Sequence, residues 1–260
     1  MLDLKSLTKE VQELALQAGQ FLEREYQKFD RTRVEEKSSH NYVSYIDKTS
    51  EHFLVKELST LLPEAGFIAE EGTGSLTDEN YCWVIDPLDG TTNYIHGMGP
   101  YAVSIALRNK EELLLGVVYE VTRKECYYAW KGSKAYMNGH EIHTSNITTL
   151  NKAFVALGFP YDSDHYRPTA IHLVDRLYGF AGGVRLLGSA AAEICYIAAG
   201  RFDARIEAFL GPWDVAASGL ILMQAGGKIS DFIGGNSWTD AQQVVATNGL
   251  LHNDILQLLH

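Results

Sequence analysis

The chain has 260 residues, of which 46% are hydrophobic, so it is long enough to bury one large core or two smaller ones. Its 22 Lys and Arg residues are outnumbered by 33 Asp and Glu residues, and the formal net charge of −11 argues against direct nucleic-acid binding, which needs a basic face. The first residues lack the pattern of a signal peptide and no segment approaches the ~20 apolar residues of a membrane span, so we expect a soluble, cytoplasmic protein without a membrane partner.

The first half of the chain predicts helices and then strands. Apolar residues at helical spacing predict helices over residues 4–28 and 47–61, and Pro63 ends the second. Short apolar runs predict the strands that follow, at 66–70, 81–86, 101–107, 113–121 and 125–130. The last three are separated by short turn signals, which is typical of an antiparallel meander.

The second half of the chain alternates strands and helices after a turn at Asn138-Gly139. The predicted strands are 153–159, 184–187, 202–208 and two further pieces, KISDF and QVVAT, and the predicted helices are 166–180, 189–199 and 214–225. This order indicates an α+β or layered α/β architecture rather than a doubly wound sheet. Because no linker or repeat divides the chain, we expect one compact unit over residues 1–260.

Two aspartates follow an apolar run in the segment WVIDPLDGTTNY (83–94). Asp86 and Asp89 are separated by Pro87 and Leu88 and followed by Gly90. Asp-Pro and Asp-Gly pairs are ordinary turn chemistry, which is the simplest interpretation. However, two carboxylates this close repel each other unless a cation lies between them. The segment therefore also predicts a metal site.

Three other acidic residues stand in similar places. Glu70 ends the strand predicted over 66–70, and Asp47 and Asp214 each stand at the start of a predicted helix. Taken singly, an acidic residue at a helix start is explained by capping and by the helix dipole. Taken together, these carboxylates form an all-oxygen donor set of the kind that Mg²⁺ prefers, and bound Mg²⁺ commonly shares oxygens of a substrate phosphate. The residue types therefore indicate magnesium-dependent phosphoryl chemistry.

Three segments carry a resemblance to a known family. IAEEG (68–72), WVIDPLDGTTNY (83–94) and GPWDVAA (211–217) resemble, in order and spacing, the motifs of the inositol monophosphatase family, which belongs to the lithium-sensitive, magnesium-dependent phosphatases. The similarity covers nearly the whole chain. It implies a layered αβαβα sandwich, a homodimer, and hydrolysis of a small phosphorylated polyol, foremost inositol 1-phosphate, to myo-inositol and phosphate.

The resemblance also implies a metal shell and the catalytic residues. The implied ligands of two to three Mg²⁺ ions are, in chain order, Glu70, Asp86, the carbonyl of Leu88, Asp89 and Asp214. Asp86 would bridge two ions. Asp47 and Thr91 would orient the attacking water and help to deprotonate it, and Glu70 would belong to the catalytic set as well.

The resemblance further implies how the substrate is held. The implied contacts are Gly90, Thr91, Arg185, Gly188, Ser189, Ala190 and Glu207. Gly90 and Thr91 begin a predicted helix whose N–H groups would meet the phosphate. Glu207 would accept hydrogen bonds from inositol hydroxyls, and Arg185 would belong to the same wall. A tight helix start explains Gly188, Ser189 and Ala190 equally well.

The chain departs from the family pattern at several positions. Asn41 stands where the family usually has an aspartate, Ser44 replaces a threonine, and Ala69 and Gly72 alter the block around Glu70. The loss of a charge at Asn41 bears on metal affinity and on the level of activity, but it leaves the five ligand positions intact. Lys37 is a weaker match to a lysine beside a third metal ion.

Other motifs are excluded by missing residues. The segment GVRLLGS (183–189) lacks the lysine of a P-loop, and HEIH (140–143) is not the HExxH pair of a zinc enzyme.

Two alternatives to an inositol phosphatase stay open. Within the same superfamily, fructose 1,6-bisphosphate and adenosine 3′,5′-bisphosphate are rival substrates. A different class of function is a regulatory interaction protein with residual phosphatase activity, because some bacterial members of the family act on transcription complexes.

Overall fold

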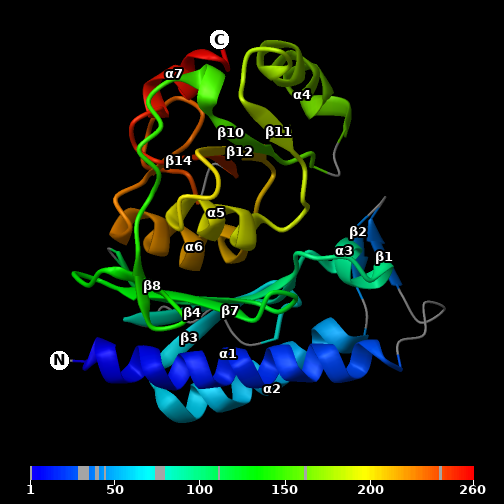
Figure 1. Ribbon diagram of the computed structural model, residues 1–260. Helices are drawn as coiled ribbons and strands as arrows, with labels where there is room; N and C mark the ends of the chain where they lie inside the picture. Colours follow the sequence, from blue (N-terminus) through cyan, green and yellow to red (C-terminus); the bar gives the residue numbers. More distant parts are fainter. Residues whose placement is uncertain are drawn as a thin grey trace.

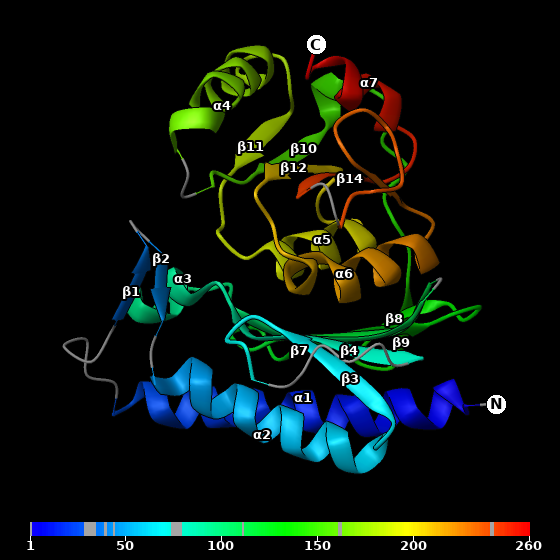
Figure 2. The ribbon, with the colours of Figure 1, turned by 180° about the vertical axis from the view of Figure 1, so that it is seen from behind.

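The protein is built in five layers (Figure 1). Two helices cover one face of a seven-stranded sheet, two more lie between that sheet and a five-stranded sheet, and two helices cover the far face of the second sheet. The view from behind shows the same stacking (Figure 2). The predicted layered α/β class and αβαβα sandwich are therefore confirmed. The computed structural model describes residues 2–28, 35–38, 41–43, 45–73, 80–110, 112–160, 163–239 and 242–260, with the backbone alone at 35–38, 41–43 and 163.

The first layer consists of α1 (Leu4–Tyr26) and α2 (Tyr45–Leu61). Asp3 caps α1, because its carboxylate accepts a hydrogen bond from the Ser6 backbone N–H at 3.2 Å. The buried face of α1 contains Val11, Ala15, Ala18 and Leu22, which recur at helical spacing. Both helices pack this kind of apolar face onto the seven-stranded sheet, as the sequence pattern predicts.

The seven-stranded sheet contains the strands predicted in the first half of the chain. In spatial order they are β3 (Ala65–Ala69), β4 (Tyr81–Asp89), β5 (Ala102–Asn109), β6 (Leu113–Glu120), β7 (Glu125–Trp130), β8 (Ala135–Met137) and β9 (His140–Ile142). Strands β3 and β4 are parallel and all the other neighbours are antiparallel. The predicted meander of β5, β6 and β7 is therefore confirmed, whereas the short strands β8 and β9 on either side of Asn138-Gly139 were not predicted.

The five-stranded sheet is formed by the second half of the chain. Its spatial order is β11 (Gly183–Arg185), β10 (Phe154–Leu157), β12 (Ala204–Ala208), β14 (Gln243–Thr247) and β13 (Lys228–Ser230), and a short 3₁₀ turn, η2 (Leu150–Lys152), precedes it. Helices α5 (Ala190–Ala198) and α6 (Pro212–Gln224) lie on the face toward the first sheet, and α4 (Ser163–Leu177) and α7 (His252–Gln257) pack on the other. Within the described ranges, each helix is too short or too polar to cross a membrane.

A small hairpin and a short helix lie beside the end of the first sheet. Strands β1 (Glu35–Ser38) and β2 (Asn41–Val43) pair antiparallel, and β2 contacts α3 (Thr91–His96) (Figure 2). Helix α3 begins directly after Gly90, which has a left-handed backbone with φ +89°. The helix expected at Gly90 and Thr91 is therefore present, but it is less than two turns long.

Helix α6 approaches the seven-stranded sheet closely at Gly116 of β6. A Cβ atom at Gly116 would lie 2.5 Å from the Ala217 carbonyl oxygen. Because only a glycine leaves room for this contact, α6 can lie low on the sheet, next to β4 and β5. This packing brings the start of α6 to the end of β4.

A buried histidine connects α7 to the second sheet. His252 is 1% exposed, and its Nε2 and Nδ1 atoms lie 2.9 Å from Ser230 Oγ and 3.0 Å from Thr247 Oγ1. Ser230 Oγ also donates to the Asp231 carbonyl oxygen, and Thr247 Oγ1 also accepts from the Gly249 N–H. This network satisfies a neutral imidazole with its proton on Nε2. Burial, together with the charge of Lys228, lowers the pKa of His252 to about 4.

We predict that His252 makes the fold sensitive to acid. The folded state resists protonation down to about pH 4, whereas the unfolded chain takes up the proton near its ordinary pKa of 6.5. The stabilisation is therefore fully present above pH 6.5 and is lost as the pH falls toward 4, with a total on the order of 3 kcal/mol. The free energy of unfolding from urea titrations at pH 7 and pH 4.5 should fall less in His252→Gln than in the wild-type protein. Equal decreases in the two proteins would contradict the assignment.

Candidate active site

A β-bulge in β4 places two aspartates on the same face of the sheet. Asp86 pairs with Ser104 of β5 and Asp89 pairs with Ala102, so three residue steps on β4 face two on β5. In a regular strand, residues three apart point to opposite faces. The extra residue cancels that alternation, and both carboxylates point to the side of the sheet where α5 and α6 lie.

The residues inside the bulge connect Asp86 to a hydroxyl–carboxylate pair. The Leu88 N–H donates to Asp86 Oδ1 at 2.9 Å, and Pro87 has no N–H to leave unpaired. The hydroxyl of Thr91 lies 3.0 Å from the Leu88 carbonyl oxygen and 3.1 Å from Asp47 Oδ1. Asp47, in the first turn of α2, is 1% exposed. The structure therefore brings together the implied water-activating pair and the implied carbonyl ligand.

Glu70 reaches the same place because β3 is parallel to β4. Ala69 pairs with Ile85, and the Glu70 N–H donates to the Ile85 carbonyl oxygen at 3.2 Å. Parallel strands end at the same edge of a sheet, so Glu70 follows β3 at the level where Asp86 follows Ile85. The charge of Glu70 acts on both Asp86 and Asp214.

Asp214 comes from the first turn of α6. Its Oδ2 accepts a hydrogen bond from the Gly211 N–H at 2.6 Å, which caps the helix. The hydroxyl of Ser104, the β5 partner of Asp86, donates to the Trp213 carbonyl oxygen at 3.1 Å. This bond holds the start of α6 against the sheet directly beside the bulge.

Three of the carboxylates converge closely. Oxygen atoms of Asp86, Asp89 and Asp214 lie within 4.8 Å of one another. Burial raises the pKa of Asp86 and of Asp214 well above the ordinary value, and repulsion from the neighbouring carboxylates raises both further. Burial also raises the pKa of Asp89, which its hydrogen bonds partly oppose. In the ionised state these groups repel one another strongly.

This donor set fits a hard divalent cation. The converging groups are carboxylates, the Leu88 carbonyl oxygen is close by, and within the described part of the site neither histidine nor cysteine joins them. A bound Mg²⁺ ion would offset the repulsion that otherwise raises the pKa values.

Glu51 is a site residue that the sequence patterns missed. It is fully buried on α2, one helical turn after Asp47, and its carboxylate accepts hydrogen bonds from the Glu71 and Thr73 N–H groups, both at 2.7 Å. These bonds hold the segment that follows Glu70. The spacing Asp47-x₃-Glu51 places both on the same side of the helix, which is the only signal in the sequence.

The N-terminus of α5 holds Asp89 from the opposite side. The Ser189 hydroxyl donates to Asp89 Oδ2, and the N–H groups of Ala190 and Ala191 lie 3.1 and 2.8 Å from its oxygens. Ser189 and Ala190, which the resemblance implied as substrate contacts, therefore bind a protein carboxylate here. Gly188 lies in the cavity wall with φ +83°.

A cavity of about 530 Å³ opens above the carboxylates. Its lining combines the acidic end with Gly90, Thr91, Thr92, Asn93, Gly158, Gly188, Ala190, Arg205, Glu207 and an apolar rim of Phe159, Leu186, Phe209 and Trp213. Thr92 was not predicted; its Oγ1 atom is buried and has no hydrogen-bond partner in the described structure. The cavity therefore has a strongly anionic end, an unsatisfied hydroxyl, and a second polar wall around Glu207.

Arg185 lies away from this cavity. Its guanidinium carbon is 4.9 Å from the centre of the Phe154 ring, and Nη1 donates to the Val184 carbonyl oxygen at 2.8 Å. The side chain is exposed on the edge strand β11 and does not belong to the cavity lining, so we leave Arg185 out of the site. The side chains of Lys37 and Asn41, and all of Ser44, lie outside the described residues.

The departures at Ala69 and Gly72 are accommodated by the backbone around Glu70. Ala69 is the last residue of β3, and Gly72 adopts φ +80°, with no atom near the position a Cβ would take. Glycine suits this left-handed conformation, so the altered block still presents Glu70 to the carboxylate cluster.

The sequence and the fold are similar to those of known proteins. The model of the inositol monophosphatase family matches residues 3–260. The Nus factor SuhB of Escherichia coli K12 is 38% identical over 236 residues, which cover 90% of this chain and 88% of that protein.

Two solved structures are also similar over nearly their whole length. The extragenic suppressor protein suhB from Bartonella henselae has a TM-score of 0.92 at 32% identity and covers 98% of both chains. The inositol monophosphatase from Anabaena has a TM-score of 0.89 at 30% identity, covering 99% of this chain and 96% of that one. The chain therefore belongs to the inositol monophosphatase family.

Proposed function

We propose that this protein is a magnesium-dependent phosphatase that hydrolyses inositol 1-phosphate to myo-inositol and phosphate. The observation that supports it best is the convergence of Asp86, Asp89 and Asp214 beside the Thr91–Asp47 hydrogen bond, within one cavity. The family is magnesium-dependent in general, and Glu70 and the Leu88 carbonyl complete a set that would hold two to three ions. When bound, Mg²⁺ would supply Lewis-acid chemistry that makes a water nucleophilic at neutral pH and neutralises phosphate charge.

In this proposal, Thr91 and Asp47 move the proton of the attacking water. The Thr91 hydroxyl donates to Asp47 Oδ1, which leaves the lone pairs of the Thr91 oxygen free to accept a hydrogen bond from water. Asp47 is buried, whereas Thr91 lines the cavity, where the attacking water would lie. A proton taken from the water would pass through Thr91 to Asp47, which is ordinary general-base geometry.

The phosphate would lie between the carboxylate end and the first turn of α3. Gly90, Thr91 and Thr92 line the cavity there, and Thr92 Oγ1 is buried without a partner. A phosphate oxygen would satisfy that hydroxyl, because an unpaired buried donor is costly. On the other side Glu70 lines the cavity, and Glu51 holds the segment that follows Glu70.

The charge of the cavity favours a monophosphate of a polyol over the bisphosphate rivals. Among the described lining residues Arg205 is the one cation. Glu207 and Glu193 both pair with it, so protein carboxylates already neutralise its charge. A second phosphate at this wall would meet excess negative charge, whereas hydroxyl groups can donate to a carboxylate. The charge of this wall therefore supports inositol 1-phosphate over fructose 1,6-bisphosphate and adenosine 3′,5′-bisphosphate.

The alternative class is an interaction protein. Its support is that several relatives are named Nus factor SuhB. The acidic net charge of this chain disfavours direct contact with nucleic acid. A homodimer and inhibition by lithium are further proposals that rest on family membership. Light scattering and lithium titration of the hydrolysis rate would test them.

The proposed activity is tested by a panel of phosphate esters with and without Mg²⁺. Inositol 1-phosphate, fructose 1,6-bisphosphate, adenosine 3′,5′-bisphosphate and p-nitrophenyl phosphate would be compared by phosphate release. We expect the highest kcat/KM for inositol 1-phosphate. A higher value for either bisphosphate would overturn the substrate assignment, and an inactive protein would overturn the enzyme assignment.

Activity should depend strictly on Mg²⁺, and excess Ca²⁺ should inhibit it. The carboxylate shell accepts both ions, but Ca²⁺ is larger and tolerates looser geometry, so the nucleophile would be misplaced. Phosphate release measured after exhaustive chelation, and then with Mg²⁺ restored and Ca²⁺ titrated in, tests this expectation. Full turnover in the chelated protein would contradict it.

Two substitutions should separate metal binding from proton transfer. Asp89→Asn removes one anionic ligand but keeps the volume, so roughly tenfold more Mg²⁺ should be needed for half-maximal activity, and high Mg²⁺ should restore part of the rate. Thr91→Ala removes only a hydroxyl, so kcat should fall about a hundredfold without rescue by Mg²⁺. Steady-state rates across a Mg²⁺ series measure both effects.

Melting temperatures of both variants provide the control. If Asp89 and Thr91 act only in capping and turns, each variant should lose about 1 kcal/mol of stability and little activity per folded molecule. Near-wild-type turnover in folded Asp89→Asn would therefore refute the metal site.

A further inference from the structure

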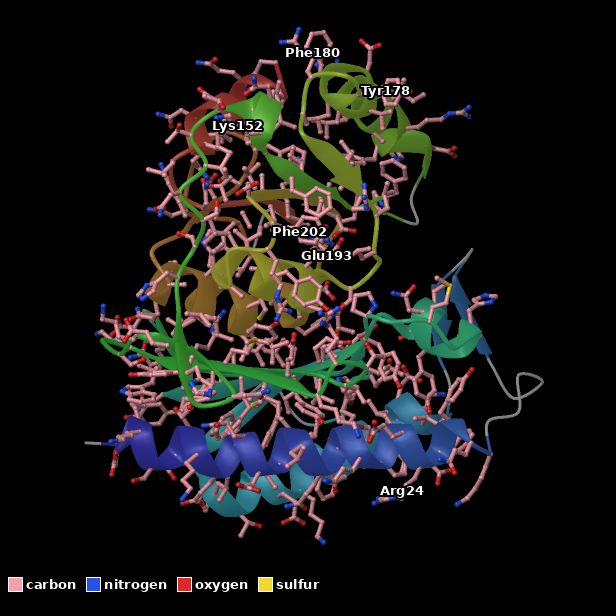
Figure 3. The ribbon with its side chains drawn as sticks, in the orientation of Figure 1. Arg24, Lys152, Tyr178, Phe180, Glu193 and Phe202 are labelled. Atoms are coloured by element: carbon pink, nitrogen blue, oxygen red, sulfur yellow. The ribbon has the colours of Figure 1, made fainter. Side chains whose placement is uncertain are left out.

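A buried ion triad supports a second wall of the cavity, which two of its members, Arg205 and Glu207, line. Arg205 of β12 donates through Nη1 to Glu193 of α5 and through Nη2 to Glu207, two residues further along its own strand. The side chains of Arg205 and Glu193 are 1% and 0% exposed, and that of Glu207 is 13% exposed. Figure 3 shows Glu193 inside the molecule, between α5 and the five-stranded sheet.

The two glutamates have different surroundings. Glu193 is enclosed, and its second oxygen accepts a hydrogen bond from the Leu187 N–H at 3.1 Å, which holds the segment before Gly188. Glu207 lines the cavity, and the described structure places no hydrogen bond on its second oxygen. Gly158 also belongs to this wall, because a Cβ atom there would collide with the Glu207 carboxylate. One glutamate therefore anchors Arg205, and the other faces the ligand.

Arg205 has one donor left over. Its Nε atom is buried and has no hydrogen-bond partner in the described structure, although Arg205 lines the cavity. A guanidinium is planar, so the bonds of Nη1 and Nη2 to two carboxylates also fix the direction of the Nε–H. A buried ion pair is costly to desolvate and is seldom explained by stability alone.

We propose that Arg205 is a positioning residue that makes this wall specific for neighbouring hydroxyl groups of a polyol. Arg205 holds one oxygen of Glu207 so that the other accepts a hydrogen bond from a substrate hydroxyl, and the Nε–H of Arg205 donates to an adjacent substrate oxygen. The inference rests on the proposed phosphatase function, and it assigns substrate selection to a residue that the sequence motifs do not contain.

The test compares Arg205→Lys with the wild-type enzyme on two substrates. Lysine keeps the charge but cannot bond two carboxylates in one plane. The ratio of kcat/KM for inositol 1-phosphate to kcat/KM for p-nitrophenyl phosphate, which has no hydroxyls, should fall about tenfold, the size of one hydrogen bond to a charged group. The decrease should come from a higher KM for inositol 1-phosphate. Calorimetric binding of inositol 1-phosphate with Ca²⁺ in place of Mg²⁺ should weaken to the same extent.

A matched control and a double-mutant cycle make the result specific. Arg201 forms a comparable pair with Glu125, at 2.6 and 2.8 Å, outside the cavity, so Arg201→Lys should leave the substrate ratio unchanged. In a Glu207→Gln background, Arg205→Lys should lower the ratio by much less than it does alone, because the two residues act together.

The possible outcomes separate the role of Arg205 from the proposed phosphatase function. Equal losses on the two substrates, or an undiminished effect of Arg205→Lys in the Glu207→Gln background, would overturn the role of Arg205 while the phosphatase function stands. If the wild-type protein hydrolyses neither substrate with Mg²⁺, the proposed function fails, and the calorimetric comparison still tests Arg205. Should Arg205→Lys not fold, the Glu193→Met/Arg205→Met pair replaces the ion pair with apolar groups and should lower the same ratio; an unchanged ratio there would overturn the proposal.

Discussion

The extra residue in β4 is the feature on which the whole site depends. Without it, Asp86 and Asp89 would point to opposite faces of the sheet, one toward α1 and α2 and the other toward α6. With it, both aspartates face the layer of α5 and α6. The N-terminus of α5 binds Asp89, and Asp214 at the start of α6 lies close to Asp86. The remaining parts of the site are placed relative to this pair.

The free-energy cost of bringing these carboxylates together is reflected in their raised pKa values and in the hydrogen bonds around them. Backbone N–H groups of Leu88, Gly211 and Ala191 each bind one of the three converging aspartates, yet burial still raises the pKa of each, and repulsion from neighbouring carboxylates raises those of Asp86 and Asp214 further. Hydrogen bonds therefore orient the ligands but do not neutralise them. A bound cation would stabilise this arrangement in its charged state, because it would offset the repulsion between the carboxylates that the fold brings together.

Much of the fold and part of the site could be predicted from the sequence, for reasons that differ by residue. The long amphipathic segment α1 could be predicted from its helical spacing of apolar residues. Elements β8, β9 and α7 are too short to show a periodic pattern. The converging aspartates were found because like charges at strand ends need an explanation. Glu51 was missed because its partners are backbone groups 20 and 22 residues away, and Arg185 was placed in the wall because the sequence does not reveal that β11 is an edge strand.

The two ends of the cavity come from different sheets, and in the proposed function this division would separate the chemistry from the selection of the substrate. Glu70 follows β3, and Asp86 and Asp89 lie in β4, both strands of the seven-stranded sheet, whereas Arg205 and Glu207 belong to the five-stranded sheet. Helix α5 joins the halves, since its N-terminus binds Asp89 and its Glu193 binds Arg205. The two ends are thus coupled through α5, and the charge of Arg205 also opposes the burial that raises the pKa of Asp89.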